Sequence, residues 1–125
     1  MRVAILGAME EEIGAVRSLL RDPSVRARAG REFVRGRIGV TDVVLAFSRW
    51  GKVAAASTAT ELILCEDVQA VVFCGVAGAL DPSLEIGDVV VADRLYQHDL
   101  DASPFFRPLH VPILDVAALP TDMEL

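Results

Sequence analysis

The sequence predicts an α/β fold: a three-layer α/β/α sandwich with a mixed central sheet. Three observations lead to this prediction. Short apolar runs that end at glycine are typical of buried strands, longer amphipathic or alanine-rich segments are typical of helices, and the two kinds alternate along the chain. The buried strands are expected over 2–7, 69–74 and 86–93, and the helices over 9–21 and 52–66.

The first strand and helix are recognised by the spacing of their apolar residues, which changes from a continuous run to intervals of three and four. Residues 2–7 form an apolar run that ends in glycine, as a buried strand does when it enters a turn. The segment 9–21 then places apolar side chains at spacings of three and four, which gives a helix one apolar stripe made by Met9, Ile13, Val16 and Leu20. Pro23 lies just beyond, as is common after a helix end.

The middle of the chain predicts a hairpin, a helix and a further strand. Residues 31–38 and 42–48 have strand character on either side of a turn. The alanine-rich segment 52–66 follows as a helix, and the apolar run 69–74 leads directly into a glycine-containing segment. A last apolar run, 86–93, is expected to be another strand.

The segment from Tyr96 onward differs in composition. It contains four prolines, at positions 104, 108, 112 and 120, which favours an extended loop over a second domain. A chain of 125 residues also suits one hydrophobic core. We therefore expect residues 1–125 to form a single domain.

Composition and charge exclude several classes of protein. The net charge of −6 makes a nucleic acid or an anionic membrane an unsuitable partner. The longest apolar runs have about seven residues, whereas a membrane span needs roughly 20. Glu10 comes too early for a secretory signal peptide. Cys65 and Cys74 lie in apolar stretches, so we expect small core thiols and a reducing, cytoplasmic environment.

Three glutamates open the first helix, and Glu12 is the one that we single out. Attraction to the positive end of the helix dipole is enough to explain Glu10 and Glu11. Glu12 lies beside the apolar stripe and is therefore expected to be partly buried at the C-terminal edge of the first strand. Open α/β sheets bind ligands at that edge, so Glu12 has either a functional role or a purely electrostatic one.

Three other segments allow two interpretations each. The glycines in 75–78 permit either close approach of a ligand or an ordinary tight turn. Trp50 is either a stacking surface or a core aromatic residue. His98, Asp99 and Asp101 favour a hydrogen-bonded structural loop over a metal site, because one histidine and two carboxylates are a weak ligand pattern. We expect no metal and no cofactor.

Taken together, these motifs resemble one family. The segments 7–12, 50–55, 75–78, 87–91 and 98–101 occur in the same order in methylthioadenosine/S-adenosylhomocysteine nucleosidases, which belong to the purine nucleoside phosphorylase superfamily. The resemblance extends from residue 1 to about residue 103. It implies the phosphorylase/hydrolase-like fold, and because the family's chains are about twice as long, it also implies a fold that is incomplete at its C-terminus.

The resemblance implies hydrolysis of the N-glycosidic bond of an adenine nucleoside, the chemistry of methionine salvage. The family residue that matches Glu12 positions the attacking water, and the one that matches Met9 lies beside the ribose. The segment matching Val76, Ala77 and Gly78 lines the ribose and base pocket. The aspartate that protonates the purine and the glutamate that binds the ribose hydroxyls belong to the family's C-terminal half and have no counterpart here.

The resemblance also implies a homodimer. The turn matching Trp50 lies near the substrate's 5′ side, and a loop reaching across the dimer covers the 5′-alkylthio group with apolar side chains. Phe105 and Phe106 are the candidates for that loop. Arg49 and Trp50 depart from the family's usual residues, so a futalosine-type nucleoside remains an alternative substrate.

Two other functions compete with hydrolysis. The superfamily's phosphorylases carry an arginine and a hydroxyl residue where this chain has Phe73 and Val76, so both phosphate contacts are missing. Arg49 could supply a cation from elsewhere, which keeps phosphorolysis as an alternative. A non-catalytic nucleoside-binding fragment is the third interpretation.

Overall fold

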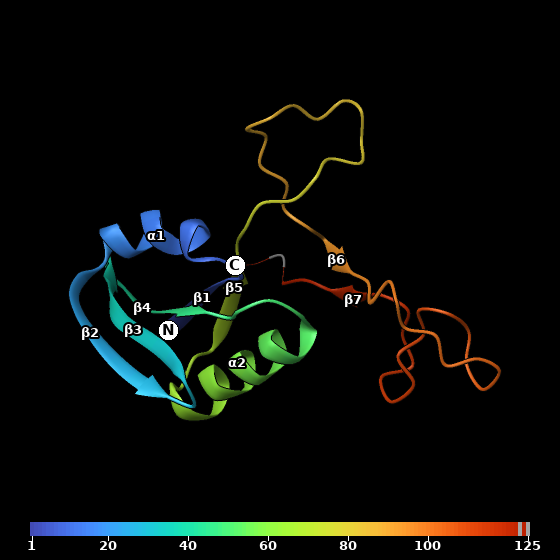
Figure 1. The fold of residues 1–125 in the computed structure, drawn as a ribbon, viewed down its shortest axis with the longest axis horizontal. Helices are drawn as coiled ribbons and strands as arrows, with labels where there is room; N and C mark the ends of the chain where they lie inside the picture. Colours follow the sequence, from blue (N-terminus) through green and yellow to red (C-terminus); the bar gives the residue numbers. More distant parts are fainter. Residues whose placement is uncertain (123, 125) are drawn as a thin grey trace. The chain divides into compact units, whose positions relative to one another are not determined.

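The computed structural model describes residues 1–122 and 124, and it arranges the chain in two compact units, Met1–Gly78 and Ala79–Leu125 (Figure 1). The first unit holds the helices and most strands. Its elements in chain order are β1 (Arg2–Gly7), α1 (Glu10–Leu19), β2 (Arg21–Arg28), β3 (Arg31–Ile38), β4 (Thr41–Phe47), α2 (Lys52–Cys65) and β5 (Ala70–Phe73).

The sheet of the first unit is mixed, with the strand order β2-β3-β4-β1-β5. β1 runs parallel to both β4 and β5, whereas β2, β3 and β4 pair as an antiparallel meander. The two helices lie on opposite faces of this sheet (Figure 1). α2 connects β4 to the parallel strand β5 on the other side of β1, a connection that requires such a crossover. α1 leads from β1 to β2 at the opposite edge of the sheet. The α/β/α layering with a mixed sheet confirms the predicted fold class.

Alternate residues of the central strands supply two separate cores. On the α2 side, the buried residues are Ala4, Leu6, Phe33, Val44, Ala46, Leu62 and Val68. On the α1 side, they are Ile13, Leu20, Val34, Val43 and Leu45. The central strands are buried on both faces, which explains why β4 is almost continuously apolar.

The β2–β3 hairpin is strongly basic on one face. Its antiparallel register places Arg21 opposite Arg37 and Arg28 opposite Arg31, and Arg26 opposite the core residue Phe33. Directly paired residues share a face, so all six arginines lie on the α2 side; they are Arg21, Arg26, Arg28, Arg31, Arg35 and Arg37.

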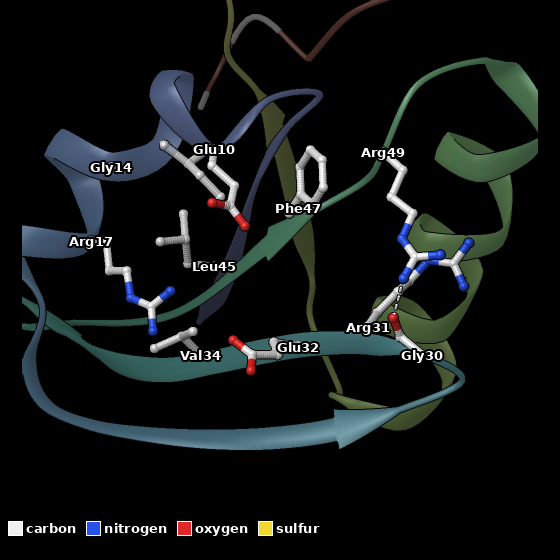
Figure 2. Close-up of a pocket in the computed structure, with 11 residues that line it drawn as sticks. Glu10, Gly14, Arg17, Gly30, Arg31, Glu32, Val34, Leu45, Phe47 and Arg49 are labelled. Atoms are coloured by element: carbon white, nitrogen blue, oxygen red, sulfur yellow. Dashed lines mark hydrogen bonds between the residues drawn. The ribbon is translucent and has the colours of Figure 1, made fainter.

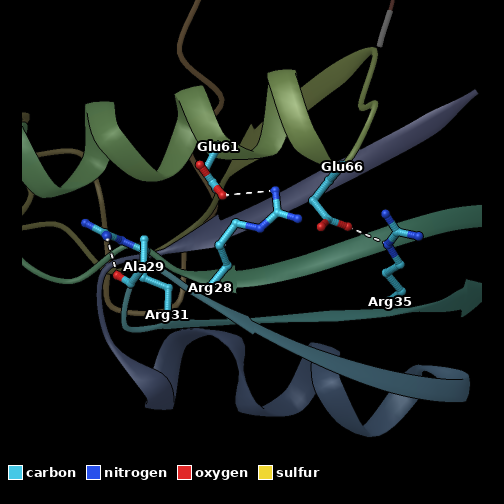
Figure 3. A network of polar contacts seen from close by, with 6 residues as sticks. All are labelled: Arg28, Ala29, Arg31, Arg35, Glu61 and Glu66. Atoms are coloured by element: carbon cyan, nitrogen blue, oxygen red, sulfur yellow. Dashed lines mark hydrogen bonds and ion pairs between the residues drawn. The ribbon is translucent and has the colours of Figure 1, made fainter.

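Two carboxylates near the end of α2 meet this basic face (Figure 3). Glu61 pairs with Arg28 at 3.3 Å, and the buried carboxylate of Glu66 pairs with Arg35. Arg2 adds a hydrogen bond to the Glu66 carbonyl at 2.8 Å. These contacts fix the end of α2 against the hairpin and against the start of β1.

The second unit is built mainly from turns. β6 (Arg94–Leu95) pairs antiparallel with β7 (Leu119–Pro120), and Val111 forms an isolated bridge with Val116. The strand predicted over 86–93 is wrong. Gly87 has φ +103°, and the backbone N–H of Asp88 donates to the Glu85 carbonyl at 3.2 Å, so a turn forms where the strand was expected to begin.

Two other expectations need correction. α1 ends at Leu19 rather than at Arg21, because the strand β2, which we did not predict, starts there. Cys65 is exposed and is not a core thiol, whereas Cys74 is partly buried and packs against the α1-side core.

Neither helix in the part of the chain that the structure describes is long and apolar enough to cross a membrane.

Candidate active site

Three turns meet at one edge of the sheet of the first unit. β1, β4 and β5 are parallel neighbours, so their C-terminal ends share that edge. The backbone N–H of Ser48, just after β4, donates to the Gly7 carbonyl at 2.8 Å, and the N–H of Cys74, just after β5, donates to the Leu6 carbonyl at 2.9 Å. These bonds hold the segments after all three strands together.

Glu12 lies in the first turn of α1 and directs its carboxylate back to this edge. One oxygen, Oε2, accepts hydrogen bonds from the backbone N–H of Ala8 at 2.8 Å and of Met9 at 2.9 Å. The other, Oε1, accepts from the backbone N–H of Val76 at 3.0 Å. Met9 is the N-cap of α1, so the carboxylate satisfies a backbone donor at the start of its own helix and one in the segment after β5.

These contacts lower the pKa of the Glu12 carboxyl. The largest cause is the Val76 N–H, followed by an opposing effect of burial and then by the N–H groups of Met9 and Ala8. Donors that bind the charged form stabilise it. The carboxylate is therefore ionised at neutral pH and fixed in direction. An ionised carboxylate has about four lone-pair positions, and three accept backbone N–H groups here, which leaves one to accept a hydrogen bond from water.

Val76 contributes its backbone rather than its side chain, which is 80% exposed. Ala77 and Gly78 follow on the same exposed segment. The glycines of this segment allowed either a ligand site or an ordinary tight turn, and neither interpretation predicted a contact with Glu12. Cys74 lies just before it, and burial together with the Glu12 charge raises the pKa of its thiol.

Trp50 lies in the turn between β4 and α2 and is 77% exposed, so it is not a core aromatic residue. Its neighbour Arg49 has φ +65°, a left-handed conformation that disfavours most side chains. The Arg49 guanidinium donates to the Gly30 carbonyl, which joins this turn to the β2–β3 turn.

Phe105 and Phe106 belong to the second unit. Phe105 is 85% exposed, and Phe106 stacks on His110 with ring centroids 5.5 Å apart. His110 in turn contacts Asp115, with Nε2 and Oδ1 separated by 2.9 Å. Among residues 1–122 and 124, no group of three His, Cys, Asp or Glu side chains could hold a metal ion.

A cavity of about 390 Å³ opens on the α1 side of the sheet (Figure 2). Its apolar lining includes Ile13, Val34, Leu45 and Phe47. Its charged lining consists of Glu10, Arg17, Arg31, Glu32 and Arg49. Neither Glu12 nor Trp50 lines this cavity, and the sequence analysis did not predict it. Of its residues, the sequence had pointed to Ile13 as part of the apolar stripe, to Glu10 as a residue at the helix start and to Arg49 as a departure from the family pattern, but to none of them as the lining of a cavity.

Comparison with known proteins shows the family of the chain. The sequence profile of the phosphorylase superfamily matches residues 2–125. The aminodeoxyfutalosine nucleosidase of Campylobacter jejuni is 41% identical over 109 residues, which are 87% of this chain and 48% of that protein. The 5′-methylthioadenosine/S-adenosylhomocysteine nucleosidase of Aeromonas salmonicida is 38% identical over 100% of this chain and 54% of its own length.

A solved structure shows the same fold. The methylthioadenosine/S-adenosylhomocysteine nucleosidase of Colwellia psychrerythraea 34H, in complex with adenine, superposes with a TM-score of 0.91 at 38% identity. The match covers 98% of this chain and 51% of that one. The chain thus spans about half the length of the relatives that it matches.

Proposed function

Because the chain belongs to the phosphorylase superfamily, we propose that it forms the water-positioning part of a purine nucleosidase. The reaction is hydrolysis of the N-glycosidic bond of an adenine nucleoside of the methylthioadenosine or S-adenosylhomocysteine type. Relatives named for that activity and for aminodeoxyfutalosine cleavage support the proposal. No cofactor takes part in it.

One observation carries this proposal: the ionised Glu12 carboxylate, held by three backbone N–H groups at the C-terminal ends of β1 and β5. Loss of the purine leaves positive charge on the ribosyl carbon, and a fixed carboxylate stabilises that charge. The remaining lone pair orients water. Because its pKa is lowered, Glu12 is a weak base, so its main contributions are orientation and charge.

The other residues of the site are proposed by resemblance. Met9 lies beside the ribose, and Trp50 faces the 5′ substituent. The segment Val76, Ala77 and Gly78 lines the ribose and base pocket. Phe105 and Phe106 cover the 5′-alkylthio group of a neighbouring subunit.

This arrangement implies a homodimer, and the exposure of Trp50 and Phe105, 77% and 85%, supports it because apolar surface of that kind marks contact sites. We further propose that the 125 residues belong to one domain, that the protein acts in the cytoplasm, and that it serves methionine salvage.

The decisive experiment measures adenine release from methylthioadenosine. The sample is a fusion of residues 1–125 to the remaining C-terminal part of the Aeromonas salmonicida nucleosidase, which aligns with all of this chain. We expect release without added phosphate. A requirement for phosphate would replace hydrolysis by phosphorolysis, and binding without turnover in the folded fusion would indicate a non-catalytic module.

The chain alone is the matched comparison. We expect residues 1–125 by themselves to release no adenine, since the resemblance assigns the purine-protonating acid to the C-terminal half. Equal rates for the chain and the fusion would show that the acid lies within this chain.

A further inference from the structure

The Glu12 carboxylate lies directly against the backbone of Gly75. A Cβ atom added at Gly75 would stand 2.7 Å from Oε1 and 2.9 Å from Cδ of Glu12. Real Cβ atoms do not approach other atoms so closely. The carboxylate therefore occupies the space that any side chain at position 75 would fill.

We propose that Gly75 is a positioning residue, whose missing side chain lets Glu12 reach the Val76 N–H. The three atoms nearest to a Cβ built at Gly75 all belong to the Glu12 carboxylate. The backbone at Gly75 is outside the left-handed region, so its conformation does not itself require glycine. Space for the carboxylate is then the reason for glycine at this position.

Gly7 is a useful comparison, because an added Cβ there would meet a different kind of atom from the one it meets at Gly75. A Cβ at Gly7 would stand 2.4 Å from Cγ2 of Ile13, a buried core residue that cannot move without repacking. A methyl group at Gly75 would instead meet the end of a flexible side chain. The fold can accept Gly75→Ala by rotation of Glu12 away from β5, whereas Gly7→Ala strains the core.

The first test measures the pKa of Glu12 by NMR, from the chemical shift of its carboxyl carbon, in the 125-residue chain. In Gly75→Ala we expect this pKa to rise, because the carboxylate loses the Val76 N–H, the largest cause of its lowered value. Gly14→Ala is the control: Gly14 lies in α1, two residues from Glu12, and a Cβ there meets nothing within 4 Å. An unchanged Glu12 pKa in folded Gly75→Ala would overturn the proposal.

The Glu12→Ala variant distinguishes a clash between the added methyl group and the Glu12 carboxylate from a general folding defect. Glu12→Ala removes the carboxylate and leaves room for the added methyl group. We expect Gly75→Ala to leave the Tm of the Glu12→Ala chain unchanged. An equal loss of Tm with and without the carboxylate would mean that the methyl group clashes with other atoms, and that Gly75 does not act through Glu12.

The activity test rests on the proposed function and uses the fusion protein. We expect Gly75→Ala to lower kcat by about 10²-fold with little change in KM, since misplacing a positioned group by about 1 Å has that effect. The acid limb of its pH profile should move to higher pH. A raised Glu12 pKa with undiminished kcat would support the positioning role of Gly75 and refute the catalytic role of Glu12.

Discussion

The Glu12 carboxylate accepts a hydrogen bond from the backbone N–H of Val76, 64 positions later in the chain, at 3.0 Å. This bond joins the first turn of α1 to the segment that follows β5. It also aligns an ionised group with the sheet edge where the ends of β1 and β5 meet. The direction of the carboxylate therefore depends on the pairing of these two strands.

Replacing the charge of Glu12 tests its catalytic role. In the fusion protein we expect Glu12→Gln to fold and to lose about 10²-fold or more in turnover, because positioned charged and acid–base groups have effects of that size. Steady-state adenine release is the measurement. Glu11→Gln, one residue away and exposed, should keep turnover near that of the parent; near-parent turnover in Glu12→Gln would refute the assignment.

Glu12 should also make the stability of the chain depend on pH. Its folded pKa lies below the ordinary value of 4.5. A lowered folded pKa gives stability that is fully present above the unfolded value and lost as pH falls through the folded value. In urea unfolding of the 125-residue chain, we expect the advantage of the parent over Glu12→Gln to shrink as the pH is lowered through this range. A gap that widens on acidification would contradict the expectation.

The ion pair between Arg35 and the buried Glu66 should stabilise the fold measurably. Glu66 is 2% exposed, so Arg35→Met leaves a buried carboxylate without its partner, at a cost of about 3 kcal/mol. Arg37→Met is the control, because Arg37 pairs with Asp22 at 3.4 Å on the exposed surface and should lose less than about 1 kcal/mol. Urea unfolding measures both; equal losses would show that burial of Glu66 does not matter.

The β5 edge should make the 125-residue chain self-associate. Val72 and Phe73 are 42% and 59% exposed on this edge strand, and exposed apolar edges invite pairing with another chain. We expect size-exclusion chromatography to show species larger than a monomer, and Val72→Lys to reduce them. Val40→Lys, at a position 98% exposed in the β3–β4 turn, should not. Association unaffected by Val72→Lys would exclude this edge.

Elements with a clear local pattern could be predicted from the sequence. β3, β4, β5 and both helices lie within a few residues of their expected positions. The apolar stripe indicated α1, the alanine-rich composition indicated α2, and short apolar segments indicated the strands. β2 could not be predicted, since all its residues are exposed and Pro23 lies within it. The prediction over 86–93 was wrong for the opposite reason: this segment is apolar but forms no strand. An apolar sequence specifies a strand only when a neighbouring strand is available to pair with it.

The candidate site divides in the same way. The partly buried place of Glu12 at the sheet edge follows from its helical phase beside the apolar stripe. Its contact with Val76 does not, because a backbone N–H has no sequence signature and the two residues are far apart in the chain. The cavity beside α1 escaped prediction because its charged lining comes from three separate segments: α1, the start of β3 and the turn after β4.

The arginines of the β2–β3 hairpin make the two edges of the sheet differ in charge, because the β2 edge is basic and the β5 edge is apolar. Arg21 faces Arg37 and Arg28 faces Arg31, and like charges directly opposite each other repel. A further strand laid along β2 would add to a row of cations, so that edge resists extension, whereas β5 offers apolar side chains. Any enlargement of this sheet, by the same chain or by another, is therefore one-sided. Added salt screens this repulsion. Ionic strength therefore controls whether another strand can pair with the β2 edge.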